Sequence, residues 1–308
     1  VGVVFPLPDA EAFRHGGQVI VLIQIPHLQG VDGIVIHIAN SGVDLHNFQP
    51  SAKDIITIGQ SDFLIYIGGE SDEWVDSAVE TAKNDRLECV NIIKELKKRS
   101  VTLQDEPDAM EISGSEDTEE EEEGEVYDEH VWLSLENAKV MTKILADKII
   151  ESHKIKGTEK EGIVLKNASS YIDKLQALNE KFKKLFDTDG EKVMVVADRF
   201  PFVYFCKDYG IKYFAACKGC ASQTEASFQT IKFLTDKVNE YNLKYIFKIE
   251  KSDTKIAETI IENSKNKNQE ILTLNSIQQV NKDEINKGAS YLSLMSENYD
   301  VLTRFVKK

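Results

Sequence analysis

The chain is poor in cysteine and has no long apolar run. Its 308 residues include four cysteines, whose spacing does not match the disulfide framework of a small secreted domain. Its richest apolar stretch, residues 19–25, is far shorter than the about eighteen apolar residues of a membrane-spanning helix. We therefore expect no membrane-spanning helix. The chain begins at Val1 without a secretory leader, which we interpret as a mature or trimmed product.

The common catalytic motifs are also absent. There is no His-Glu-x-x-His, no Gly-x-Ser-x-Gly and no glycine-rich phosphate loop. Cys217 and Cys220 form one CxxC motif, but no second CxxC or nearby histidine pair completes a zinc ribbon. We interpret them as two thiols in a loop, and a redox pair is the alternative. Without a general base or nucleophile, the sequence indicates a binding protein and not an enzyme.

Positive charge is scarce, because 37 basic residues face 52 acidic ones and the net charge is −15. A field of this sign repels nucleic acid and anionic lipid and favours a cationic ligand. The first 42 residues hold no lysine but three of the six histidines. Two interpretations stay open for this stretch: a buried pair of opening strands, or a segment that is not the natural partner of the rest of the chain.

Strand and helix patterns alternate along the chain. Residues 63–69 form a short apolar run closed by glycines, which is typical of a buried parallel strand. Further strands are predicted at 192–197, 212–216, 245–249 and 271–274, and helices at 89–98, 137–150, 159–186, 204–209, 228–241, 255–263 and 291–306. This order predicts an α/β fold of two lobes with parallel-dominated sheets, joined by a long helix.

The expected domains are an N-terminal α/β lobe (1–158), a linking helix (159–188) and a C-terminal α/β lobe (189–308). Residues 103–126 lack hydrophobic periodicity and are predicted to form a mobile acidic loop. Within it, the run 116–125 is almost purely acidic. The run is interpreted as a solvated spacer, or alternatively as a segment that concentrates divalent cations.

Two histidines lie in loops that lead into predicted helices. His46 precedes Pro50 and a helix that begins near Ser51, and His130 follows the acidic run. Such loops collect binding residues in α/β lobes. A zinc ion takes about three or four ligands from His, Cys, Asp or Glu. His46 and His130 are therefore candidate metal ligands, although a histidine taken singly is more often a surface or a satisfied structural residue.

The surroundings of both histidines resemble a known family. Residues 44–54 are similar to the His-x-aromatic-x-Pro-Ser/Thr-x-x-Asp loop of the zinc and manganese solute-binding proteins of ABC transporters, the ZnuA/TroA-like metal-binding lipoproteins. Residues 128–134 resemble the second ligand segment of that family. Residues 61–74 fit the strand and turn between the two segments.

The resemblance continues through the second half of the chain. Residues 197–210 are similar to the third ligand segment of the family. The later matching segments are 219–227, 249–260 and 291–298. Together these segments extend the resemblance from about residue 41 to the end of the chain.

The resemblance implies four metal ligands: His46, His130, Asp198 and Asn275. The third position usually carries His or Glu and the fourth Asp or His, so the chain departs from the family at both. Asp198 can alternatively pair with Arg199 or cap the following helix. Asn275 can alternatively support a ligand without touching the metal, because a carboxamide oxygen binds zinc weakly.

Glu225 is a substitute carboxylate, or an acid at the start of a helix. The resemblance further implies a metal site in the cleft between the lobes and limited lobe motion. The implied function is extracytoplasmic capture of zinc, with manganese as the alternative, and delivery to the membrane permease of an ABC transporter. The implied location is the periplasm or the outer face of the cell membrane, held there by a lipid anchor, and the protein is expected to be a monomer. The alternatives are a metal-independent adhesin or scaffold on the same fold, and a zinc hydrolase.

Overall fold

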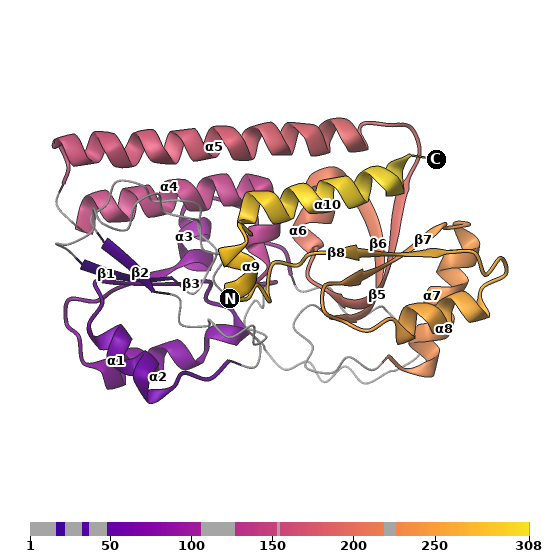
Figure 1. The fold of residues 1–308 in the computed structure, drawn as a ribbon, viewed down its shortest axis with the longest axis horizontal. Helices are drawn as coiled ribbons and strands as arrows, with labels where there is room; N and C mark the ends of the chain where they lie inside the picture. The colour runs from indigo at the N-terminus through magenta and orange to yellow at the C-terminus, as the bar shows by residue number, and fades with distance from the viewer. Residues whose placement is uncertain are drawn as a thin grey trace. The chain divides into compact units, whose positions relative to one another are not determined.

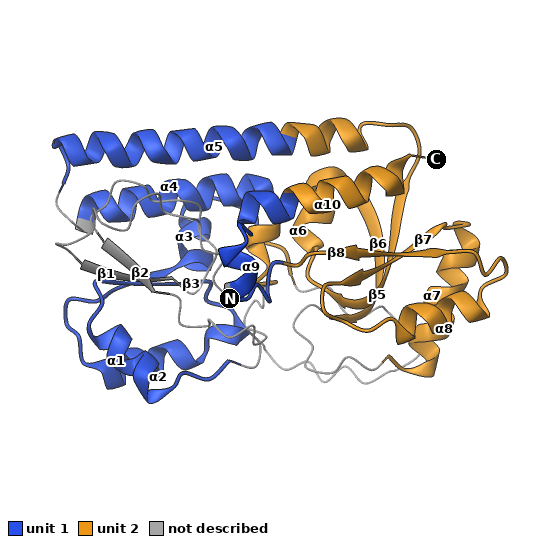
Figure 2. Cartoon of the chain, in the orientation of Figure 1, with its two compact units in different colours: residues 1–102, 135–179, 277–295 blue, residues 103–134, 180–276, 296–308 orange. Residues whose placement is uncertain are grey.

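The computed structural model describes residues 17–21, 33–36, 48–105, 127–152, 155–218 and 226–307. The chain divides into two compact units, each built from three stretches of sequence (Figure 2). Unit 1 comprises residues 1–102, 135–179 and 277–295, and unit 2 comprises residues 103–134, 180–276 and 296–308. Within the described ranges, no helix has both the length and the apolar character needed to cross a membrane.

Unit 1 contains a parallel four-stranded sheet in the order β2-β1-β3-β4. Its strands are β1 (Gly17–Val21), β2 (Gly33–Ile36), β3 (Phe63–Tyr66) and β4 (Glu88–Asn91). The predicted strand at 63–69 is confirmed over its first four residues, all of which are buried. Because β1 pairs with both β2 and β3, the opening of the chain supplies two strands to this sheet, as the first interpretation of that stretch predicts. The predicted burial of these strands lies outside what the structure describes.

Helices cover both faces of this sheet, with α1 and α2 on one face and α3 and α4 on the other (Figure 1). The helices of unit 1 are α1 (Ala52–Gly59), α2 (Trp74–Ala82), α3 (Ile92–Lys98), α4 (Leu135–Ser152), α9 (Lys282–Asn286) and the first part of α5 (Glu159–Phe186), with a 3-10 turn, η3, at Glu70–Asp72. Ile58, Leu64, Val75 and Ala78 form an apolar core between α1, α2 and β3. Ser51 caps α1 through a reciprocal capping box with Asp54, as expected for this end of the His46 segment.

The predicted helix at 89–98 is wrong over its first three residues. Cys89 and Val90 pair with β3 as part of β4, and the helix begins only at Ile92. Asn91 marks the boundary, because its side chain accepts the backbone N–H of Lys94 and caps α3. The Asn91 side chain also packs against Gly68, where φ is +94°. A Cβ at position 68 would lie only 2.1 Å from Nδ2 of Asn91, so the position requires glycine.

Unit 2 contains a second parallel sheet, in the order β6-β5-β7-β8. Its strands are β5 (Lys192–Phe200), β6 (Ile211–Lys218), β7 (Tyr245–Ile249) and β8 (Glu270–Leu274). Its helices are α6 (Val203–Tyr209), α7 (Phe228–Glu240), α8 (Lys255–Asn263) and the later parts of α5 and α10 (Tyr291–Val306). Val195, Leu234, Ile246 and Ile260 join the strands to α7 and α8 in one core. The predicted α/β class with parallel sheets and a long helix is confirmed.

Candidate functional site

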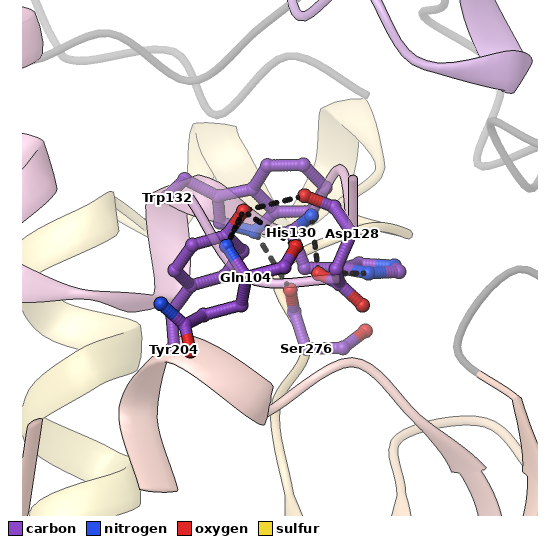
Figure 3. Close-up of polar contacts among 6 residues, drawn as sticks. All are labelled: Gln104, Asp128, His130, Trp132, Tyr204 and Ser276. Carbon is purple, nitrogen blue, oxygen red and sulfur yellow. Dashed lines mark hydrogen bonds and ion pairs between the residues drawn. The ribbon is translucent and has the colours of Figure 1, made fainter. Parts of the chain in front are cut away.

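His130 stands directly before a short 3-10 turn, η4 (Val131–Leu133), which leads into α4. The side chains of His130 and Asp128 are both 0% exposed. Oδ1 of Asp128 lies 3.1 Å from Nδ1 of the imidazole and accepts the backbone N–H of His130 at 2.9 Å (Figure 3). The prediction that His130 lies in a loop before a helix is therefore confirmed, and its ring is part of a buried pair.

The backbone of Asp128 is held from two sides. Its N–H donates to the carbonyl oxygen of Gln104 at 2.9 Å. Its carbonyl oxygen accepts the hydroxyl of Tyr204, on α6, at 2.8 Å, and the same hydroxyl accepts the N–H of Gln104 at 3.2 Å (Figure 3). Burial raises the pKa of Tyr204 well above its usual value, so the hydroxyl remains a donor. These bonds fix Asp128 in one position.

Trp132 borders the imidazole of His130, with the two ring centroids 5.2 Å apart. The indole Nε1–H donates to the carbonyl oxygen of Ser276 at 3.1 Å (Figure 3). Ser276 is itself held by Glu250, whose two carboxylate oxygens accept the backbone N–H and the hydroxyl of Ser276 at 2.7 and 2.8 Å. The Trp132 side chain beside His130 is therefore connected through Ser276 to Glu250 by hydrogen bonds within unit 2.

The segment with the expected fourth ligand, Asn275, directly precedes Ser276 at the end of β8. The backbone N–H of Asn275 donates to Asn298 Oδ1 at 2.7 Å, and its carbonyl oxygen accepts Asn298 Nδ2 at 2.8 Å. Asn298 belongs to α10, and both ends of its carboxamide bond to the backbone of Asn275. The side chain of Asn275 is thus mounted on a backbone that cannot easily shift.

Asp198, the expected third ligand, is buried near the end of β5. Its Oδ1 accepts the backbone N–H of Arg199 at 2.8 Å, and its Oδ2 accepts the backbone N–H of Ile249 at 3.1 Å. The carboxylate therefore links the ends of β5 and β7. Each oxygen keeps one further lone pair, so this structural role still leaves room for a weak contact to a cation.

The remaining candidate ligands, His46 and Glu225, lie outside the described residues, as does the acidic run 116–125. Within the part of the chain that the structure describes, no three side chains of His, Cys, Asp or Glu are grouped as a metal site. The described contribution to the candidate site is therefore the buried pair of His130 and Asp128 with the residues around it.

The described residues on either side of 106–126 meet one another. Asp105 and Tyr127 form an antiparallel bridge, next to the hydrogen bond between Asp128 and Gln104. Of the two described residues that border 106–126, Tyr127 therefore lies close to His130 in the sequence, and the bridge places Asp105 beside Tyr127.

Cys217, the first thiol of the CxxC motif, is buried in β6. Burial raises its pKa, and the neighbouring Asp198 carboxylate raises it further. A reactive thiol requires a lowered pKa, so these surroundings favour the interpretation of Cys217 as an inert packing residue. Cys220 lies outside the described residues.

Sequence reasoning missed Asp128 as a partner of His130, although the signal was present. An Asp two residues before a histidine has the spacing at which its side chain accepts the N–H of residue i+2. Tyr204 and Ser276 carried no such signal, because they are 76 and 144 residues away from their partners in this site.

Replacing Tyr204 by phenylalanine is expected to destabilise unit 2 by about 1–3 kcal/mol, because it leaves a buried carbonyl oxygen and a part-buried N–H without their partner. Urea unfolding measures this loss. Tyr241→Phe is the matched control, since its hydroxyl only accepts the Lys212 ammonium at an exposed position and its removal should cost less than about 0.5 kcal/mol. Equal stabilities of the two variants would show that the Tyr204 hydroxyl does not hold Asp128.

Comparison with known proteins places these features in a family. The model of the family "Zinc-uptake complex component A periplasmic" matches residues 28–305. The high-affinity zinc uptake system protein ZnuA of Bacillus subtilis (strain 168) is 28% identical over 268 residues, which are 85% of this chain and 77% of that protein. The zinc-binding lipoprotein AdcA of Streptococcus pneumoniae (serotype 4) is 26% identical over 262 residues, 85% of this chain and 49% of AdcA. The chain spans about half the length of the AdcA relatives that it matches.

A solved structure of a zinc-binding protein has the same fold as this chain. The crystal structure of a Zn(II)-bound AdcAII variant of Streptococcus pneumoniae superimposes with a TM-score of 0.73 at 25% identity, covering 95% of this chain and 99% of that one. The resemblance found in the sequence is therefore confirmed over almost the whole chain. Because the family match runs from residue 28 to residue 305, the chain belongs to the family of periplasmic component A proteins of zinc-uptake complexes.

Proposed function

We propose that the protein captures a divalent transition metal outside the cytoplasm, zinc in preference to manganese, and delivers it to the membrane permease of an ABC transporter. The observation that carries the proposal is the buried His130 imidazole, mounted on Asp128 at the position where the family motif has a ligand. A carboxylate beside one imidazole nitrogen is the usual companion of a histidine that binds metal through its other nitrogen. Zinc is the cargo, which the protein binds and releases.

The proposed ligands are His46 and His130, with Asp198 and Asn275 as the candidates for the remaining positions. Two imidazoles favour zinc over manganese, which prefers oxygen ligands. The carboxylate of Asp198 is the stronger metal ligand of the two, but both of its oxygens already accept hydrogen bonds from backbone N–H groups. The backbone of Asn275 is held by two hydrogen bonds to Asn298, but its carboxamide oxygen is a weak zinc ligand. Site-specific variants of these two residues would rank them.

The location and the partner are supported by the relatives. AdcA is named a lipoprotein, and the matching family is named as periplasmic. We therefore place this chain outside the cytoplasm, in the periplasm or on a lipid anchor, as a monomer that hands zinc to its permease. The net charge of −15 agrees with a cation as cargo and disfavours nucleic acid as a partner.

The deciding experiment is calorimetric titration of the chain after removal of metal by a chelator. We expect one zinc ion per chain, bound tightly, and displacement of bound manganese by zinc. Absence of stoichiometric binding for both ions would overturn the proposal and leave the metal-independent adhesin or scaffold as the better explanation. Tighter binding of manganese than of zinc would overturn the choice of metal.

A further inference from the structure

The contact between His130 and Asp128 determines which imidazole nitrogen carries the hydrogen and which carries the lone pair. We propose that Asp128 is a positioning residue that holds His130 in the tautomer with hydrogen on Nδ1, so that Nε2 carries the lone pair that binds the metal. This inference rests on the proposed function and deepens it, since it assigns the donor atom and the residue that selects it.

Hydrogen-bond chemistry requires a hydrogen on Nδ1, and in the neutral ring this leaves the lone pair on Nε2. Oδ1 of Asp128 lies 3.1 Å from Nδ1 and already accepts the backbone N–H of His130. A bare Nδ1 would direct its lone pair at that oxygen, and a separation of 3.1 Å between two fully buried side chains leaves no space for a molecule between them. Hydrogen on Nδ1 turns this repulsion into a hydrogen bond. The Nε2 nitrogen is then the acceptor and the only ring atom that can bind a metal.

The surroundings fix the carboxylate and the ring in this relation. Asp128 is anchored through its backbone by Gln104 and Tyr204. Trp132 lies against the imidazole and is itself hydrogen-bonded to Ser276. A donor atom held by packing and by outer hydrogen bonds needs little reorganisation when the metal arrives.

The surroundings of the second carboxylate oxygen, Oδ2, indicate that the negative charge of Asp128 contributes to metal binding. Among the described residues, Oδ2 is buried and has no hydrogen-bond partner. An asparagine could accept the same two N–H groups through its Oδ1 without the cost of a buried, half-satisfied carboxylate. The charge becomes useful when a cation binds at Nε2, because the carboxylate then stabilises the positive charge that spreads onto the imidazole. Asp128 therefore serves both to orient the ring and to strengthen it as a ligand.

Nitrogen-15 NMR of the metal-free protein tests the tautomer directly. The His130 signals are assigned as those lost in the His130→Gln variant. We expect the wild-type protein to show a protonated Nδ1 and an unprotonated Nε2, and Asp128→Asn to keep this tautomer because the amide oxygen still accepts. In Asp128→Ala both tautomers should be populated, because the acceptor is gone.

Zinc affinity tests the second role. Loss of an outer hydrogen-bond partner of a metal-binding histidine weakens metal binding by about 10–100-fold. We expect Asp128→Asn near the lower end of that range and Asp128→Ala near the upper end. Asp208→Asn is the matched control. Asp208, on α6, accepts the hydroxyl of Ser134 at 2.6 Å, and Ser134 lies in the same segment as His130. This variant should leave both the tautomer and the zinc affinity unchanged.

Several results would overturn the inference. A wild-type His130 with hydrogen on Nε2, or an Asp128→Ala variant with the wild-type tautomer and zinc affinity, would each do so. If Asp128→Ala does not fold, Asp128→Asn with a native thermal transition decides, since its full zinc affinity would refute the role of the charge. If the wild-type protein binds no zinc, the proposed function fails, while the NMR result still decides the tautomer.

Discussion

Replacing His130 by alanine is expected to weaken zinc binding by more than about 100-fold. Removal of an outer partner of a metal-binding histidine already costs about 10–100-fold, and here the ligand itself is lost. The substitution also leaves the buried Asp128 carboxylate without its imidazole partner. Competition titration against a chelator of known affinity measures the change, because it covers a wider range than direct calorimetry.

Two further variants make this test specific to the ligand. His130→Gln preserves much of the volume and hydrogen-bonding capacity of the side chain, so it separates the loss of the imidazole from the opening of a cavity. His153→Ala is the matched histidine control, because the sequence assigns His153 to no candidate site. It should bind zinc within about 2-fold of the wild-type chain, as expected for a histidine that is not a ligand. A folded His130→Ala protein with wild-type affinity would remove His130 from the site.

Much of the fold could be predicted because its signals are local. The helix at 159–186 and the strand at 245–249 have the predicted boundaries, since hydrophobic periodicity and turn residues mark both ends. The strand β4 was missed because Cys89 and Val90 run directly into the apolar pattern of α3. Only their pairing with β3, which is a long-range interaction, makes them a strand. The composition of the two units depends on such interactions and was not predictable from residue patterns.

In the candidate site too, features with a local sequence signal could be predicted, and features that depend on long-range contacts could not. His130 was found from the sequence because a family motif surrounds it. The residues that hold its neighbours come from distant parts of the chain, and Tyr204 reaches Gln104 across 100 positions. Asp198 illustrates the limit most clearly. Its bond to the N–H of Ile249 exists because β5 and β7 lie side by side, and no pattern around Asp198 contains that information.

Replacing Phe182 by alanine is expected to destabilise unit 2 by about 3–5 kcal/mol, the range for a fully buried phenylalanine. Phe182 lies in the last part of α5 and is 0% exposed. Its ring centroid is 5.1–5.3 Å from those of Phe205, Tyr209 and Tyr299, on α6 and α10. The substitution therefore opens a cavity among three aromatic rings. It also removes the edge-to-face contacts with Phe205 and Tyr299, worth about 0.5–1.5 kcal/mol each.

The measurement should report on unit 2 alone, because the two units can unfold separately. Trp132 belongs to unit 2 and Trp74 to unit 1, so the fluorescence of Trp132 in a Trp74→Phe background isolates the relevant transition. Phe228→Ala is the matched control: Phe228 also belongs to unit 2 but is 79% exposed, and its loss should cost less than about 0.5 kcal/mol. If both phenylalanines cost the same, the aromatic cluster does not anchor α5 to unit 2. A large difference would instead show that α5 is held there by packing, since the Phe182 side chain has no polar atom that could contribute otherwise.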